Sequence, residues 1–89
     1  MLLVERAFVD RLRGETARAQ VTAAEARSKA RAAGFVPLEL AARLEEALAM
    51  DAASDPRART YLAALESDAA TRGFVLVSRK AARAIRASR

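Results

Sequence analysis

Apolar residues recur along most of this chain at spacings of three and four, the period of a helix that buries one face. Two such stripes are complete: one consists of Leu40, Ala41, Leu44 and Leu48, and the other of Ala58, Tyr61, Leu62, Leu65 and Ala69. Only three glycines and two prolines interrupt the helix-favouring stretches. The pattern predicts an all-α protein.

Glycines and prolines mark where the predicted helices end and begin. Gly34-Phe35-Val36 and Gly73-Phe74-Val75 each follow an Ala-rich, charged stretch, and glycine closes a helix because it adopts the left-handed conformation without steric cost. Pro37 and Asp55-Pro56 are typical of helix starts, and Ser78 is a candidate cap for a last helix. These marks predict helices over residues 2–33, 37–50, 56–72 and 79–87. We therefore expect a single domain over residues 1–89, a small helical bundle of three long helices plus a short basic C-terminal helix.

Two points of this layout stay open. Gly14 would divide the first helix into two shorter ones, whereas a continuous helix pays only about 1 kcal/mol for an internal Gly relative to Ala. Residues 74–77 form a continuous apolar run that also fits a short strand, but a strand needs a second one and the chain offers no other candidate.

The apolar content is unusual because 24 alanines stand beside 23 larger apolar residues, so the core must be thin. An alanine seam lets a neighbouring helix approach closely but removes little surface from water, at ~25 cal/mol per Å². We therefore expect the seam of the first helix to be an interface, either with a second copy in a homodimer or larger oligomer or with a partner protein. Its residues are Phe8, Leu12, Ala19, Ala23, Ala26 and Ala30.

Positive and negative charge alternate along the chain. Residues 1–36 carry a net charge of +3, residues 37–68 one of −4 and residues 69–89 one of +6, which sum to the overall +5. The basic residues of the last helix fall on one face, which favours contact with the phosphates of duplex nucleic acid. The few aromatic residues fit core and cap positions and leave no platform for single strands. The candidate phosphate contacts are Arg79, Lys80, Arg83, Arg86 and Arg89, with Arg27, Lys29 and Arg31 on the first helix.

Several kinds of chemistry lack their usual residues. Cys and His are absent, which removes thiol nucleophiles, disulfides, the common ligands of transition metals and the side chain that titrates near neutral pH. We therefore expect no cofactor, no metal and no catalytic residue. The longest uncharged stretch, residues 32–38, is far shorter than the ~20 residues of a membrane-spanning helix, and the N-terminus lacks the pattern of a secretory signal. These features, with the excess of Ala and Arg, predict a cytoplasmic protein of a bacterium or of its phages and plasmids.

One class of enzyme needs neither Cys nor His. A pericyclic rearrangement requires only cations that hold a dianionic substrate in a helical pocket. A long first helix followed by two shorter ones resembles the all-helical chorismate mutases, which use Arg and Lys in homodimers of similar length. The resemblance implies Arg31 and Arg43 as the cations, and Leu44 stands where that family's pattern has Glu.

Together these features favour a binding protein over an enzyme. The sequence predicts a DNA-associated regulatory or accessory protein that contacts phosphates without reading the base sequence. The alternative is a protein–protein interaction module, such as an adaptor, inhibitor or assembly chaperone, that acts through the long Ala-rich helix.

Overall fold

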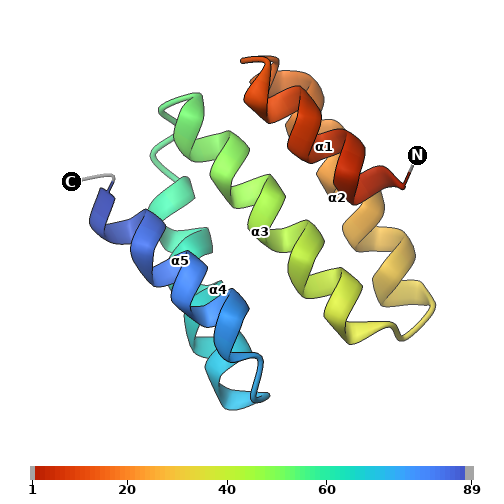
Figure 1. Cartoon of the computed structure of the whole chain (residues 1–89), viewed down its shortest axis with the longest axis vertical. Coiled ribbons are helices and arrows are strands. Elements are labelled where there is room, and N and C mark those ends of the chain that lie inside the picture. The colour runs from red at the N-terminus through yellow and green to blue at the C-terminus, as the bar shows by residue number, and fades with distance from the viewer. Residues whose placement is uncertain (1, 88–89) are drawn as a thin grey trace.

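The described part of the chain folds into five helices and contains no strand. The computed structural model describes residues 2–87 (Figure 1). The helices are α1 (Leu3–Leu12), α2 (Thr16–Ala32), α3 (Val36–Ala52), α4 (Ala58–Thr71) and α5 (Val75–Ala87). The prediction of an all-α protein is confirmed, whereas the predicted number of helices is too small by one.

The central element is α3, which contacts all four other helices. Helices α1 and α2 form a hairpin along one side of it, and α4 and α5 form a second hairpin along the other side (Figure 1). The two hairpins do not contact each other. The resulting molecule is a slab of 32 × 30 × 18 Å, with α1 and α5 on one broad face and α2 and α4 on the other.

The predicted first helix is in fact two helices, because the chain reverses at Gly14. Gly14 has a φ of +80°, a conformation that side chains other than glycine's disfavour. Its N–H donates to the backbone carbonyl oxygen of Arg11 (3.0 Å), and the next N–H, of Glu15, donates to the backbone carbonyl oxygen of Asp10 (2.9 Å). This is the hydrogen-bond pattern of a Schellman C-cap. The reversal folds α1 back onto α2 and α3. The break at Gly14 that the sequence left open is therefore the observed one.

The last helix also differs from its prediction, since α5 begins at Val75 rather than at residue 79. Residues 75–77 are helical, so the strand alternative for the apolar run 74–77 is wrong. Ser78 lies inside the first turn of α5, where its hydroxyl donates to the carbonyl oxygen of Glu66 on α4 (3.2 Å). The apolar run serves packing, because Phe74 and Val77 rest against the core cluster between α3 and α4.

Ser54, between α3 and α4, occupies a left-handed conformation that glycine would adopt more easily. Its φ is +59°, and the N–H of Asp55 donates to the carbonyl of Met50 (2.9 Å) to close the turn. We expect Ser54→Gly to raise the free energy of unfolding by about 0.5–1 kcal/mol, since the left-handed region strains a residue that has a Cβ. For a domain of this size that is a rise in Tm of a few degrees, measurable by thermal denaturation. Ser28→Gly, the same change at an exposed position within α2, should lower Tm, and equal effects at both sites would contradict the argument.

The core is built from few large side chains and many alanines. The largest fully buried residues are Leu40, Leu62 and Leu65, which cluster with Leu44 and with parts of α4 and α5. On α2 the buried apolar residues are all alanine, and α2 touches only α1 and α3. The α1–α2 hairpin is therefore held on α3 by the close approach of the helices at alanine residues and not by large apolar side chains.

This packing corrects the predicted role of the alanine seam. Ala19, Ala23, Ala26 and Ala30 are at most 4% exposed within the single chain, so the chain's own α1 and α3 already cover them. The sequence pattern identified a helix interface but assigned it to a second copy or a partner protein, because the pattern within one segment does not show which helices of the same chain pack against it. Phe8 (43% exposed) and Leu12 (65% exposed) are the seam residues that stay accessible.

Candidate nucleic-acid interface

Helix α5 presents a basic face to solvent. Arg79, Lys80, Arg83 and Arg86 are all exposed. On the opposite side of the helix, Ala81 is fully buried and Ala84 and Ile85 pack against the core cluster. Because the basic residues recur at three and four positions, burial of the apolar side fixes their direction outward. Arg89, the fifth predicted contact on this helix, lies outside the described residues.

The four described cations of α5 form no ion pair with another described residue, in contrast to most of the arginines elsewhere. Among the described residues, seven basic side chains form ion pairs: Arg11, Arg18, Arg27, Lys29, Arg43, Arg57 and Arg72. None of the four exposed cations of α5 does so within residues 2–87. The sequence explains this difference, since no acidic residue follows Asp68. Residues 79 to 86 span about 10 Å of helix, so four uncompensated positive charges are concentrated in one short strip.

The second predicted basic group, on α2, has a different environment. Arg27 donates from Nε to Glu46 (2.8 Å), and Lys29 pairs with Glu25 (3.2 Å). Arg31 is exposed and has no ion pair within the described residues. Moreover, α2 and α5 lie on opposite sides of α3 and do not touch. The structure therefore does not join Arg27, Lys29 and Arg31 to the basic strip of α5.

Arginine–carboxylate pairs tie three helices to α3. They join Arg11 of α1 to Glu45 (2.9 Å), Arg27 of α2 to Glu46 (2.8 Å), and Arg43 of α3 to Asp68 of α4 (2.7 Å). Glu45 and Glu46 are neighbours in sequence, so they point about 100° apart on the helix and reach different partners. These partners are 19 to 34 residues apart, so their pairing cannot be inferred from spacing along the sequence.

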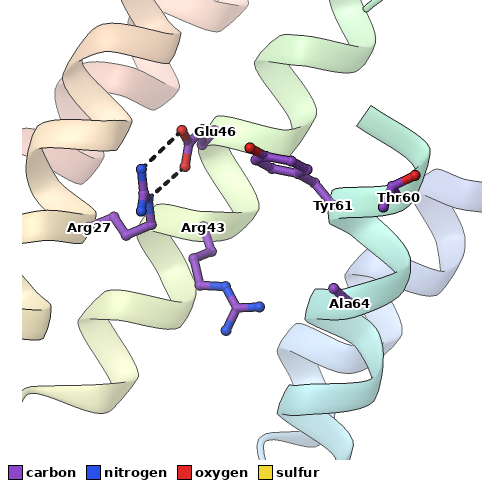
Figure 2. Close-up of a pocket in the computed structure, with 6 residues that line it drawn as sticks. All are labelled: Arg27, Arg43, Glu46, Thr60, Tyr61 and Ala64. Carbon is purple, nitrogen blue, oxygen red and sulfur yellow. Dashed lines mark hydrogen bonds and ion pairs between the residues drawn. The ribbon is translucent and has the colours of Figure 1, made fainter. Parts of the chain in front are cut away.

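A cleft of about 340 Å³ opens between α2, α3 and α4, and Figure 2 shows the residues that line it: Arg27, Arg43, Glu46, Thr60, Tyr61 and Ala64. Both arginines are already hydrogen-bonded to carboxylates, Arg27 to Glu46 and Arg43 to Asp68. Arg31, the other cation implied by the resemblance to chorismate mutases, does not line the cleft. The arrangement works as a pair of ties between helices and not as a clamp of free cations for a dianion.

The Arg43–Asp68 tie shifts the titration of its carboxyl group. The hydrogen bond from Arg43 and then the charge of Arg43 hold the pKa of Asp68 below its ordinary value of 3.8. Similarly, the side-chain hydrogen bond from Arg57 lowers the pKa of Asp55. A carboxyl group with a lowered pKa in the folded state stabilises the fold above its unfolded pKa, and this contribution is lost as pH falls through the lowered value.

We expect the cost of Asp68→Asn to depend on pH in that direction. The difference in unfolding free energy between the wild type and Asp68→Asn should be constant above about pH 5 and shrink as pH falls toward about 2, since a protonated Asp68 resembles Asn. Urea unfolding at several pH values measures it. In an Arg43→Gln background the difference should be nearly independent of pH, and a difference that is as large at pH 3 as at pH 6 in the wild type would contradict this assignment.

Comparison with protein-family models, with curated proteins and with solved structures gives no match to this chain. Within residues 2–87, no helix combines the length and the apolar character needed to cross a bilayer. The same residues contain no group of three or more acidic side chains placed to hold a metal ion. Any functional assignment therefore rests on the geometry and charge described above.

Proposed function

We propose that this protein is a non-enzymatic, DNA-associated regulatory or accessory protein of a bacterium or mobile element, acting in the cytoplasm and contacting duplex phosphates through α5. The observation that carries the proposal is the strip of four exposed cations on α5 that no acidic side chain within residues 2–87 neutralises. Unpaired arginines donate directly to phosphate oxygens, whereas paired ones must first give up a carboxylate.

The absence of an aromatic residue from the α5 strip favours double-stranded over single-stranded nucleic acid. Proteins that hold single strands stack bases on exposed aromatic rings beside a basic groove. Helix α5 itself contains no aromatic residue. Among the described residues, Phe8 of α1 is the single ring that shares a hollow with Lys80 and Arg83, and Tyr61 lies on α4 in the cleft of the opposite broad face, so no row of rings follows the basic residues. Contacts from Arg and Lys to phosphates alone provide affinity without base-sequence selectivity.

A second candidate function, a protein–protein interaction module, is supported by the exposed apolar side chains of α1. Phe8 and Leu12 remain accessible although the alanines of the same predicted seam are buried. A partner helix would therefore bind to the outer side of α1 and not along α2. An apolar interface of that kind is nearly indifferent to salt, which separates it from phosphate binding.

The proposal is tested by fluorescence anisotropy with a labelled duplex of random sequence across a salt series. If four cations each displace one counterion, the slope of log K against log salt is about −4, and affinity falls about 150- to 250-fold between 50 and 200 mM salt. Duplexes of different sequence should bind alike. Absence of binding at 50 mM salt would overturn the proposal, and so would binding whose strength does not change with salt.

A further inference from the structure

An apolar groove runs along the broad face opposite the Arg27–Arg43 cleft. Helices α1 and α5 are its two walls and α3 is its floor (Figure 1). Two adjoining hollows of about 270 and 470 Å³ make up its length, and they share Phe8, Leu44, Glu45 and Lys80. The walls carry Phe8 (43% exposed) on α1 and Leu76 (66% exposed) on α5. Large apolar side chains thus face solvent on both sides of one groove.

The two walls carry opposite charges at the same height along the groove. Glu5 of α1 and Lys80 of α5 line the same hollow, together with Phe8 and Leu76. Neither Glu5 nor Lys80 forms an ion pair within the described residues. The other charged pair of this hollow's surroundings, Arg11 and Glu45, is already neutralised by its own contact (2.9 Å). Within the described residues, the α1 wall therefore presents one unpaired negative charge, Glu5, and the α5 wall presents two unpaired positive charges, Lys80 and Arg83.

We propose that this face is the interface of a homodimer, in which a second copy of the chain docks with its α1 against α5. A twofold rotation about an axis parallel to the groove places α1 of one copy over α5 of the other. It leaves every residue at the same position along the groove. It therefore brings Glu5 opposite Lys80 of the second copy, and Phe8 opposite Leu76, and it makes each contact twice. Closed twofold dimers of this kind require a surface that is complementary to itself, and opposite charges on the two walls meet that requirement.

The broad face is large enough for a second copy of the chain to dock on it. The whole molecule measures 32 × 30 Å across its broad face, which is large enough to contain the roughly 800 Å² per partner of a stable interface. Of the large apolar residues that are at least 43% exposed, Phe8 and Leu76 line this groove. The inference does not rest on the proposed function, although the two share residues. Lys80 and Arg83 line the groove, whereas Arg79 and Arg86 do not, so the dimer leaves Arg79 and Arg86 of each copy outside the interface.

The experiment is sedimentation velocity of the full chain from 5 to 500 μM at 150 mM salt, with circular dichroism to verify that each variant is folded. The wild type should be a dimer, and Leu76→Ser and Phe8→Ser should each raise the dimer dissociation constant about tenfold or more. Val21→Ser provides a matched control, since Val21 is 71% exposed on α2, which lies on the other broad face, and should dimerise like the wild type. A wild type that is monomeric at every concentration overturns the proposal, and so does a dimer that only Val21→Ser weakens.

Charge reversal tests the proposed orientation. Glu5→Lys and Lys80→Glu should each weaken the dimer by about tenfold, because each places two like-charged contacts in the interface. The combined variant exchanges the charges of the two walls and should restore the dimer to near the wild-type affinity. Failure of this restoration, with both single variants weakened, would overturn the docking of α1 against α5 and indicate that the two walls do not meet.

Discussion

Replacing Arg79, Arg83 and Arg86 with glutamine is expected to reduce the salt slope of duplex binding from about −4 to about −1 and to weaken binding a few hundredfold at 0.1 M salt. The reason is that each lost cation removes about 0.9 from the slope, because one fewer counterion is released from the DNA. The variant should keep its fold, since these side chains are exposed and glutamine favours helix about as well as arginine. Anisotropy titrations at four or five salt concentrations measure the slope directly.

A matched control separates the position of the charge from its amount. Arg6, Arg13 and Arg31 are also exposed and form no ion pair within residues 2–87, so changing them to glutamine lowers the net charge equally, from +5 by three to +2. This second variant should keep a slope close to the wild-type value. Equal flattening in both variants would mean that overall charge attracts the DNA and that α5 has no special part.

Some turns between the helices can be predicted from the sequence and others cannot, for physical reasons. Gly34 and Gly73 were recognisable as helix ends because each follows a long helical stretch and precedes an apolar residue. Gly14 was ambiguous, since one glycine costs a continuous helix only about 1 kcal/mol. The chain reverses there because α1 then packs against α2 and α3. That burial is a long-range effect, and local pattern does not contain it.

The apolar run at residues 74–77 was ambiguous for a similar reason. Four consecutive apolar residues fit a strand, a loop or the start of a buried helix. Phe74 and Val77 pack against the core cluster of α3 and α4, and this packing places them at the start of α5.

Asp10 is a polar residue in the interior. It is 6% exposed, and one of its carboxylate oxygens has no hydrogen-bond partner among the described residues. Nothing in the sequence or the packing explains its burial.

The candidate site was predictable where it depends on a single helix. The basic strip follows from the helical period and from the absence of acidic residues after Asp68, both of which are read within one segment. The basic residues of α2 were misleading because Arg27 is neutralised by Glu46, which is 19 residues away in sequence. Whether an arginine is free or paired depends on the helix that packs beside it. Sequence alone therefore identifies the candidate cations and leaves their availability to the fold.

The core prediction with the largest expected effect is Leu62→Ala, which should lower the free energy of unfolding by about 3–5 kcal/mol. Leu62 is fully buried on α4 and belongs to the cluster that joins α3, α4 and α5. The cost of such a cavity depends on how far its neighbours relax into it, and much of this core is alanine, whose methyl groups cannot reach across a gap. A domain of this size has a total stability of about 4–13 kcal/mol, so a large share would be lost.

Leu12→Ala is the matched comparison, since Leu12 is 65% exposed at the end of α1 and its truncation should change stability by only about 0.5 kcal/mol. Urea unfolding followed by circular dichroism measures both variants. A loss below about 1 kcal/mol for Leu62→Ala would contradict the assignment of this leucine to a tightly packed core. The same result would also weaken the account of α5, because the direction of its basic strip depends on the burial of Ala81 against this cluster. Core stability and the exposure of the cations are thus linked through one helix, because the burial of Ala81 in this cluster fixes the direction of the basic strip.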